Sequence, residues 1–430
     1  MALYPAVKVT DSLRGSGWIK RIARRWRGDV RVFDHLNRLV PEPILRLMSQ
    51  YRADCSTDKV DLGIGVYRDS SGHTPVLDCV RRAEHSVLAA QSTKTYVGAL
   101  GREEFNRHVE VLALGAEHSA LGAQRVRTIQ TPGGCGALRL GAELIKAATP
   151  AAKVLVGNPT WGNHIPLLGA SGLRLEHYAY YDPGTHELLF DQMLERLEQA
   201  AGDDVVLLHA CCHNPSGLDP TPAQWRTLVD CLLRRRLVPF VDLAYQGLGD
   251  DLLADVASTR LIFQELPEAL LAVSFSKNLG LYRDRVGALL VLSQSADHAE
   301  TVQSHTMQIA RGIYSMPPDH GAAVAATILG DAELTQAWSR ELIPMRQRIA
   351  DMRALLTNHL RDTTGNDAFD FIKTQRGMFS LLGIAADAVV RLREQHHIYM
   401  TPDGRINLAG LNPDNVAYVS RAIARELRAR

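Results

Sequence analysis

The segment VVLLHACCHNPSGLDPTPAQWRTLVDCLLRRRLVPFVDLA, residues 205–244, indicates the fold class of the chain. The apolar runs VVLLHA (205–210) and LVPFVDLA (237–244) have the length and composition of buried strands. The stretch TPAQWRTLVDCLLRRR (221–236) between them is long enough for a helix. Two buried strands joined through a helix are typical of parallel neighbours in a sheet that is covered on both faces.

The same alternation continues on both sides of this segment. A helix is predicted at GALRLGAELIKAA (136–148), and further buried strands are predicted at VRTIQ (126–130), KVLVGN (153–158), LLAVSFS (270–276) and VGALLVLS (286–293). We therefore expect an α/β fold with a mostly parallel sheet flanked by helices. Reactive groups are then expected near the carboxyl ends of its strands.

The C-terminal part of the chain has a different pattern. Long amphipathic helices are predicted at 335–361 and 412–429, around a short strand in RINLAG (405–410). This pattern predicts a second, smaller α+β domain beside the sheet domain. The expected boundaries are a large domain at 75–344 and a small domain formed by 32–74 and 345–430.

The first residues, 1–31, form a basic extension before the catalytic body, which we expect to begin near Val32. This extension is rich in arginine and has no acidic residue between Asp11 and Asp29. It fits either an amphipathic targeting peptide or a solvated extension without a targeting signal. A mitochondrial location therefore stands as the alternative to a cytoplasmic one.

The composition of the chain argues against nucleic acid or a membrane as its main binding partner. The 430 residues are 46% hydrophobic and 22% charged, with a formal net charge of +1, so no global field favours nucleic acid or an anionic membrane. The longest apolar runs are far shorter than the roughly 20 residues of a membrane-spanning helix. The six cysteines show no metal-ligand spacing and two of them are adjacent, which favours free thiols in a reducing, cytoplasmic compartment. Small molecules are the expected partners.

Three segments carry residues suited to catalysis. In QTPGGCGALRLG (130–141) a glycine-rich turn joins a strand to a helix, a geometry that binds phosphate but is also found in ordinary tight turns. In LLAVSFSKNLGLYRDRVG (270–287), Lys277 directly follows a buried strand, close to Ser274 and Arg285. Most lysines are solvated, but burial beside cations lowers the pKa of a lysine and frees its amine to attack a carbonyl.

The third segment is LVPFVDLAYQG (237–247), in which Asp242 ends an apolar strand and Tyr245 follows three residues later. A carboxylate in such a place needs a partner. The partner can be the protonated ring nitrogen of a pyridoxal cofactor, or Asp242 can simply cap a helix or turn.

Together these segments resemble the class I aminotransferases of the aspartate and aromatic amino-acid subgroup. The resemblance extends from Val32 to the C-terminus, and ten motifs occur in family order: DLGIGVYRD (61–69), KTYVGALGREEFN (94–106), QTPGGCGALR (130–139), NPTWGNH (158–164), CHNPSGLDPTPAQW (212–225), VDLAYQG (241–247), SFSKNLGLYRDRVG (274–287), YSMPP (314–318), RGMFS (376–380) and GRINLAG (404–410). The resemblance implies a fold-type-I enzyme that uses pyridoxal 5'-phosphate.

The resemblance also implies the contacts of the cofactor. Lys277 would hold it as a Schiff base and act as the catalytic base. Asp242 would pair with the pyridinium nitrogen, while Tyr245 and Asn214 would hydrogen-bond the phenolate oxygen and Trp161 would stack on the ring. The phosphate would be bound by Ser274, Arg285, Gly133, Gly134, Cys135 and, from a neighbouring subunit, Tyr96. The last of these contacts implies a homodimer with shared active sites.

The substrate contacts follow from the same resemblance. Arg405 resembles the arginine that binds the α-carboxylate, and Arg311 the one that crosses the dimer interface to a distal carboxylate. Gly65 and the pair Ile44–Leu45 resemble the segment that closes over the substrate, and Trp161 and Asn214 are also expected to contact it. The implied reaction is a ping-pong transamination between an L-amino acid (aspartate, tyrosine or phenylalanine) and a 2-oxo acid such as 2-oxoglutarate.

Two positions depart from the family pattern. Cys135 replaces a threonine or serine, and a thiol is a weak donor to phosphate. Met316 replaces an asparagine or serine near Arg311, so that Arg311 is less firmly held and can swing aside for an aromatic substrate. The sequence therefore leaves the choice between acidic and aromatic substrates open.

Several histidines lie near cysteines or other polar residues. His209 and His213, next to Cys211 and Cys212, lack a second ligand cluster, so we expect histidines of a hydrogen-bonded core and no metal. His164 is expected to support Asp242, and His396 and His397 to be a solvated helix end. Two other functions stay open: another pyridoxal reaction, such as β-elimination from cysteine conjugates, and a non-catalytic interaction protein.

Overall fold

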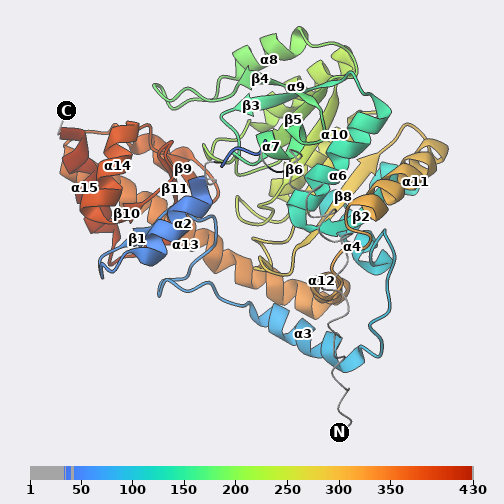
Figure 1. The fold of residues 1–430 in the computed structure, drawn as a ribbon, viewed down its shortest axis with the longest axis horizontal. Coiled ribbons are helices and arrows are strands. Elements are labelled where there is room, and N and C mark those ends of the chain that lie inside the picture. The colour runs from blue at the N-terminus through green and yellow to red at the C-terminus, as the bar shows by residue number, and fades with distance from the viewer. Residues whose placement is uncertain (1–32, 34, 40–42, 429–430) are drawn as a thin grey trace, which may run out of the picture. The chain divides into compact units, whose positions relative to one another are not determined.

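The computed structural model describes Phe33, residues 35–39 and residues 43–428 (Figure 1). The chain divides into two compact units, Met1–Glu42 and Pro43–Arg430. In the first unit, all the described residues are exposed. The basic extension at 1–31 lies outside the described residues. The second unit begins at Pro43, later in the chain than the predicted start near Val32.

A seven-stranded sheet forms the centre of the second unit, and its order is β2-β8-β7-β6-β5-β3-β4. Its strands are β2 (Val126–Pro132), β3 (Lys153–Asn158), β4 (Arg174–Ala179), β5 (Val205–His209), β6 (Val238–Leu243), β7 (Ala269–Ser274) and β8 (Val286–Leu292). Only β8 runs against its neighbours in this sheet. The predicted α/β class and the mostly parallel sheet are therefore confirmed.

The predicted strands are all present, but β4 was missed. It has the sequence RLEHYA at the edge of the sheet, and its side chains are mostly exposed or half-buried. An edge strand has no need of a continuous apolar run, because part of its surface faces solvent. Strand β4 therefore has no apolar run that would mark it in the sequence.

Apolar side chains of the central strands cover both faces of the sheet. Along β5, Val205 and Leu207 belong to one buried cluster, and Val206 and Leu208 belong to the other. This alternation follows from the two-residue period of a strand. Gly141 of helix α6 (Gly133–Ala148) allows close packing, since a Cβ atom there would overlap the Phe240 ring of β6.

Helices cover the sheet on both sides (Figure 1). The helices between β1 (Val60–Asp61) and α13 (Ala332–Thr364) in the chain are α6 together with α3 (Asp78–Ala90), α4 (Glu103–Leu114), α5 (Ser119–Gly122), α7 (His164–Gly169), α8 (Phe190–Glu198), α9 (Pro222–Arg235), η2 (Ala254–Val256), α10 (Ala257–Glu265), α11 (Ala296–Ile313) and α12 (His320–Gly330). Of these, α3 packs against α12. Helix α9 begins with a capping box, in which Thr221 and Gln224 bond each other's backbone N–H groups.

The remaining elements surround two small sheets. Strand β1 (Val60–Asp61) pairs in parallel with β10 (Ile398–Tyr399), and β9 (Phe379–Leu381) pairs antiparallel with β11 (Arg405–Asn407). The helices here are α2 (Pro43–Ala53), α13 (Ala332–Thr364), η3 (Asp370–Thr374), α14 (Ala386–His396), η4 (Leu408–Gly410) and α15 (Val416–Arg428). Helix α13 packs against α15 and also against α3 and α12, so it connects this region to the helices of the central sheet.

Three further observations bear on the sequence predictions. None of the helices in the described ranges is both long and apolar enough to cross a membrane. All six cysteines are free thiols. The prediction of a solvated helix end at His396 and His397 is wrong for His396, which is buried and bonds Glu426 Oε1 at 3.0 Å. His397 caps the end of α14 with its side chain 41% exposed, as predicted, and bonds Asp54 Oδ2 at 2.8 Å.

Candidate functional site

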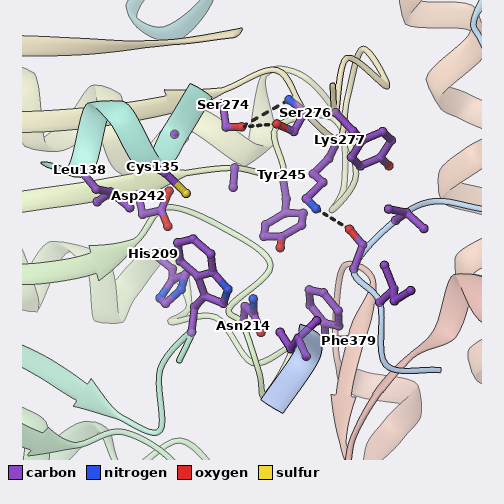
Figure 2. Close-up of a pocket in the computed structure, with 18 of the residues that line it drawn as sticks. Cys135, Leu138, His209, Asn214, Asp242, Tyr245, Ser274, Ser276, Lys277 and Phe379 are labelled. Atoms are coloured by element: carbon purple, nitrogen blue, oxygen red, sulfur yellow. Dashed lines mark hydrogen bonds between the residues drawn. The ribbon is translucent and has the colours of Figure 1, made fainter. Parts of the chain in front are cut away.

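A cavity of about 280 Å³ lies at the carboxyl ends of strands β5, β6 and β7 (Figure 2). Twelve of the predicted site residues line it: Ile44, Gly65, Gly134, Cys135, Trp161, Asn214, Asp242, Tyr245, Ser274, Lys277, Arg285 and Arg405. Residues from α2, from the loop after β1 and from β9 complete its wall. The cavity is close to the lower end of the size range of small-molecule pockets, roughly 300–1,000 Å³.

Lys277 follows strand β7 and extends into the cavity (Figure 2). Its Nζ atom donates a hydrogen bond to the carbonyl oxygen of Gly65 and lies 5.1 Å from the centroid of the Tyr282 ring. Burial lowers the pKa of Lys277 to about 8, helped by the positive charges of Arg405 and Arg285. A useful fraction of the amine is therefore neutral and nucleophilic near neutral pH.

Asp242 near the end of β6 is the anionic group of the cavity. Its Oδ2 atom lies 3.1 Å from His164 Nε2, and His164 Nδ1 lies 2.8 Å from Thr160 Oγ1. Register places His209 of β5 directly beside Asp242. The contact between His164 and Asp242 is the one that the sequence led us to expect, and it fixes the orientation of the carboxylate.

The turn between β2 and α6 forms a site suited to an anion. Gly133 has φ +69°, and a Cβ atom there would lie 2.6 Å from Arg285 Nη2, so the guanidinium packs directly on the turn. Arg285 Nη1 donates to Ser276 Oγ at 3.3 Å, and Ser274 Oγ donates to the same oxygen at 3.2 Å. A helix N-terminus, a guanidinium and two hydroxyls are a combination that binds phosphate.

Cys135 lies in the first turn of α6 and lines the same cavity. Its nearest polar contact is Asn163 Nδ2 at 3.9 Å from the sulfur. Burial raises the pKa of this thiol, so the sulfur stays protonated at neutral pH. It can offer only the weak S–H donor that the sequence predicts.

A buried arginine lies across the cavity from this turn. Arg405 of β11 is 5% exposed, and its guanidinium donates to Asn214 Oδ1 at 3.1 Å and to the Gly63 carbonyl at 2.8 Å. The Phe379 ring lies 4.4 Å from its Cζ atom. These contacts fix the plane of the guanidinium, which suits it to bind a carboxylate with two parallel hydrogen bonds.

Tyr245 lies near Lys277 and Phe379 in the cavity (Figure 2). Its ring meets the Phe379 ring edge to face, with centroids 5.9 Å apart. Burial raises the pKa of the Tyr245 phenol, and the nearby charge of Arg405 opposes this effect only in part. The hydroxyl therefore remains protonated and can act as a hydrogen-bond donor.

Four predicted residues do not line the cavity, and one of them is Leu45, which is exposed. Gly133 lies behind it against Arg285, as described above, whereas Tyr96 is 88% exposed and Arg311 is exposed. Arg311 donates to Ser315 Oγ, and the Val97 N–H lies 3.1 Å from the Met316 sulfur. Action of Tyr96 and Arg311 on a neighbouring subunit stays a prediction.

Some lining residues were given no role from the sequence. Tyr282 lies within the motif that contains Lys277, and its hydroxyl accepts from the Tyr67 N–H at 2.8 Å. Phe379 lies within the RGMFS motif, and His209 at the end of β5 was treated as a core residue. The sequence did contain signals that these three residues belong to the site. Tyr282 and Phe379 lie inside family motifs, and His209 lies at the end of a buried strand.

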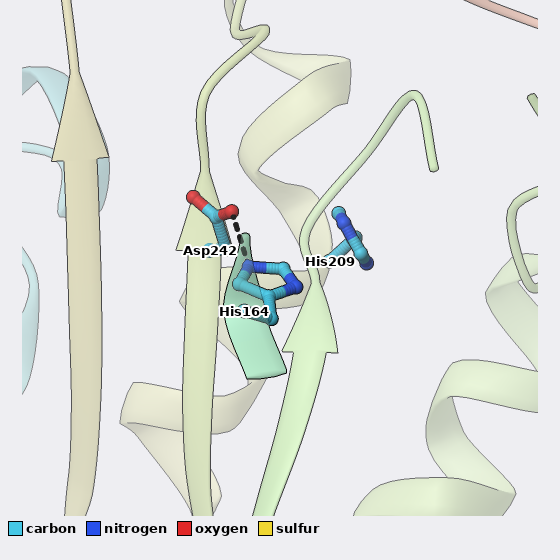
Figure 3. A group of neighbouring side chains, drawn as sticks. All are labelled: His164, His209 and Asp242. Carbon is cyan, nitrogen blue, oxygen red and sulfur yellow. Dashed lines mark hydrogen bonds and ion pairs between the residues drawn. The ribbon is translucent and has the colours of Figure 1, made fainter. Parts of the chain in front are cut away.

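His164, His209 and Asp242 are grouped closely enough to raise the question of a metal (Figure 3). Their ligand atoms all lie within 4.8 Å of one another. Both nitrogens of His164 already have hydrogen-bond partners, whereas zinc would need a free lone pair about 2.0–2.1 Å away. Burial lowers the pKa of His209 to about 3, so its ring is neutral. The arrangement favours a hydrogen-bond network behind Asp242, and the absence of a metal stays a prediction.

Comparison with known proteins gives a consistent family. A model described as aminotransferase class I and II matches residues 57–423. The chain is 42% identical over 392 residues to the aspartate aminotransferase of Escherichia coli, covering 91% of this chain and 99% of that one. It is 44% identical over 392 residues to the aromatic-amino-acid aminotransferase of Pseudomonas aeruginosa, covering 91% and 98%.

A similar architecture is found among solved structures. The aromatic-amino-acid aminotransferase of Burkholderia pseudomallei, covalently bound to pyridoxal phosphate, aligns with a TM-score of 0.90 and 40% identity. That alignment covers 93% of this chain and all of the other. The cytoplasmic aspartate aminotransferase of Saccharomyces cerevisiae aligns with a TM-score of 0.89 and 34% identity, covering 93% and 99%.

Proposed function

Because the chain belongs to the class I and II aminotransferases, we propose that the residues lining its cavity divide the tasks of a reversible transamination among them. The protein is a pyridoxal-phosphate-dependent aminotransferase, which exchanges the amino group of an L-amino acid with a 2-oxo acid. The observation that carries the assignment of roles is that Lys277, Asp242, Arg285 and Arg405 line one cavity.

The donors of this cavity fit the chemistry of the cofactor. Gly133 and Gly134 leave space at the N-terminus of α6, where Arg285 and Ser274 supply a charge and a hydroxyl for the phosphate. Asp242 supplies the negative charge that a protonated ring nitrogen requires. When bound, the cofactor supplies an electron-accepting ring that stabilises negative charge at the substrate α-carbon.

We assign the proton transfer to Lys277. Its pKa of about 8 leaves part of the amine neutral, so Nζ can accept a proton from the substrate α-carbon. Its hydrogen bond to the Gly65 carbonyl connects it to the loop after β1, whose residues 64–66 also line the cavity. Tyr245 remains a protonated phenol and supplies a hydrogen bond to the oxygen of the bound ring.

We assign substrate orientation to Arg405. The fork of its guanidinium can pair with the α-carboxylate, while Asn214 and the Phe379 ring restrain it. This pairing decides which bond of the α-carbon faces Lys277, and therefore which bond is broken. Ile44 of α2 and Gly65 line the mouth of the same cavity and are suited to exclude water once a substrate is bound.

We propose that the enzyme accepts both acidic and aromatic amino acids. Relatives named for aspartate and relatives named for aromatic amino acids match this chain almost equally well. Arg311 supplies a cation for a distal carboxylate, and Met316 offers it neither an amide nor a hydroxyl, so an aromatic substrate would need to break the exposed hydrogen bond from Arg311 to Ser315 Oγ. An aromatic side chain can therefore displace Arg311 at modest cost.

We also propose a homodimer with shared active sites, in the cytoplasm. Tyr96, Val97, Met307 and Ile313 are exposed apolar or aromatic side chains near the segment predicted to reach a neighbouring site. The division into a large domain at 75–344 and a small one at 32–74 and 345–430 is retained as part of this proposal. Neither β-elimination nor a non-catalytic role is favoured, because the named relatives are aminotransferases.

The decisive experiment is a half-reaction titration of the purified holoenzyme. Aspartate, glutamate, tyrosine and phenylalanine are added separately, and the absorbance of the bound cofactor is followed. Loss of the initial band with acidic and aromatic donors alike supports dual specificity. Loss with acidic donors alone contradicts it, and release of pyruvate and ammonia from a β-substituted donor would reveal elimination.

A further inference from the structure

Arg353 is a buried charged residue of helix α13 that does not line the cavity. It is 4% exposed, and its guanidinium donates five hydrogen bonds. The acceptors are the carbonyl oxygens of Ile372 (3.2 Å), Arg376 (3.1 Å), Gly377 (2.7 Å) and Phe379 (2.6 Å), and Ser380 Oγ (2.6 Å). All five belong to one short segment, residues 372–380.

This arrangement differs from that of an ordinary buried arginine, which is paired with a carboxylate. In the part of the chain that the structure describes, no carboxylate forms an ion pair with Arg353. Burial lowers the pKa of Arg353 to about 10, so the side chain is still charged at neutral pH. The cost of burying this charge is offset mainly by four backbone carbonyls and the Ser380 hydroxyl, with the charge of Asp219 acting without an ion pair. These acceptors are thereby held in one arrangement.

The segment 372–380 is also fixed on its other side. The Arg376 N–H donates to the Gly217 carbonyl at 2.7 Å, and a Cβ atom at Gly377 would overlap the Cys212 side chain. Ser380 Oγ donates to Gln375 Oε1 at 2.5 Å within the segment itself. The segment therefore lies between α13 and the 212–217 turn, which also carries Asn214.

From this segment the chain enters β9 and the substrate side of the cavity. Phe379 pairs with Asn407, and Leu381 pairs with Arg405, in the antiparallel β9–β11 ladder. The Phe379 carbonyl accepts from Arg353, while its ring lies 4.4 Å from the Arg405 guanidinium. The position of Phe379 thus depends on Arg353 on one side and limits Arg405 on the other.

We propose that Arg353 is a positioning residue for carboxylate recognition: it orients the Phe379 backbone and thereby the plane of the Arg405 guanidinium. The inference rests on the proposed role of Arg405 in binding the substrate α-carboxylate. A lysine could not replace Arg353, because an ammonium has three donors and no planar fork to span five acceptors. The chemical class recognised is a carboxylate common to amino-acid and 2-oxo-acid substrates.

Helix α13 offers a matched control one turn earlier. Arg348 is half-buried, donates to the backbone carbonyls of Ala409 at 3.4 Å and Leu411 at 2.5 Å, and has its Cζ atom 5.8 Å from the centroid of the Tyr67 ring. These acceptors lie in the turn after β11 and do not include Phe379 or its neighbours in β9. An effect that comes only from loosening α13 should therefore be shared by Arg348→Lys.

The test compares the holoenzymes of wild type, Arg353→Lys, Arg348→Lys and Arg405→Lys. Succinate and 3-phenylpropionate, which carry a carboxylate but no amino or keto group, are titrated by calorimetry. A misaligned charge-assisted hydrogen bond should raise both dissociation constants about tenfold in Arg353→Lys, which corresponds to ~1.4 kcal/mol. Arg348→Lys should leave both constants unchanged, and the cofactor spectrum should be the same in all four proteins.

Kinetics separates positioning from a general loss of structure. In Arg353→Lys the half-saturating concentration of the amino acid should rise with the dissociation constants, while the maximal half-reaction rate changes by less than about twofold. A lower melting temperature with unchanged dissociation constants would overturn the inference. If Arg405→Lys also leaves the constants unchanged, the proposed role of Arg405 has failed instead.

If Arg353→Lys does not fold, the variant Ser380→Ala, which changes fewer contacts, tests the same inference. Ser380→Ala removes one of the five acceptors and the hydrogen bond to Gln375, but leaves the four carbonyls. It should raise the dissociation constant of 3-phenylpropionate about threefold, a loss smaller than one full charge-assisted bond. A folded Ser380→Ala protein with the wild-type constant would refute the inference.

Discussion

Replacement of Lys277 by methionine should stabilise the cofactor-free protein near neutral pH, although it abolishes transamination. Burial beside Arg405 and Arg285 lowers the pKa of Lys277 from 10.5 to about 8, so the folded state disfavours the charged amine. One pKa unit corresponds to about 1.4 kcal/mol, so this lowering costs the wild type ~3 kcal/mol of folding free energy at pH 7. Methionine has a similar length and carries no charge, so it removes the cost.

The sign of the pH dependence follows from proton binding. Between about pH 8 and 10.5 the unfolded wild type binds more protons than the folded protein, so the stability of the wild type rises with pH. The penalty is fully present below pH 8 and disappears above pH 10.5. The advantage of Lys277→Met should therefore shrink by about 2 kcal/mol between pH 7 and pH 9.5. Lys277→Met also loses the hydrogen bond to the Gly65 carbonyl, and this loss reduces the gain in stability equally at every pH, so it does not affect the pH dependence.

Urea unfolding of the two cofactor-free proteins at pH 7, 8, 9 and 9.5 measures this difference directly. Lys373→Met, at an exposed lysine, is the control, and its effect on the free energy of unfolding should not vary with pH. A stability difference between wild type and Lys277→Met that stays constant from pH 7 to 9.5 would falsify the argument from burial. Retained transamination in Lys277→Met would refute its catalytic role.

Three further predictions concern the cofactor and the substrate. Asp242→Asn should slow the half-reaction at least about 100-fold, because a neutral amide does not stabilise a charged ring nitrogen; stopped-flow spectroscopy would show this, and a rate within tenfold of wild type would argue against the pairing. Arg311→Ala should lower kcat/KM for aspartate about 100-fold and for phenylalanine less than about tenfold, since only aspartate leaves a carboxylate unpaired; equal losses would exclude Arg311 as the distal ligand. Cys135→Ser should tighten cofactor binding several-fold, because a hydroxyl is a better donor to phosphate than a buried thiol; equilibrium dialysis that shows weaker binding in Cys135→Ser would contradict the proposed contact.

The sequence predicted the centre of the fold better than its edge. Five of the strands in the central sheet lie inside long apolar runs because they are covered on both faces, and β2 was found in the same way. Strand β4 has charged residues such as Arg174 and Glu176, since it lies at the edge. Helix α13 was expected from its amphipathic pattern, although it extends to Ala332 and Thr364 at its ends.

The sequence singled out residues that line the cavity where a residue type has a local signal. Lys277 and Asp242 stood out because a charged residue at the end of an apolar strand is unusual. Arg353 has no such signal, because four of its five partners are backbone carbonyls that any sequence provides. His396 was misjudged for a related reason: Glu426, which binds it, is distant in the chain and becomes its neighbour only in the folded protein.

The antiparallel strand β8 also affects how the protein is made. Strand β2 pairs along its whole length with β8, Val126 with Leu292 and Pro132 with Val286. At a synthesis rate of about 5–20 residues per second, β8 leaves the ribosome roughly 10–30 s after β2. During this interval β2 lacks β8, the strand with which it pairs in the sheet, and its backbone edge is open to incorrect pairing. The anion-binding turn can therefore acquire its final shape only late in synthesis, when β8 brings Arg285 beside Gly133.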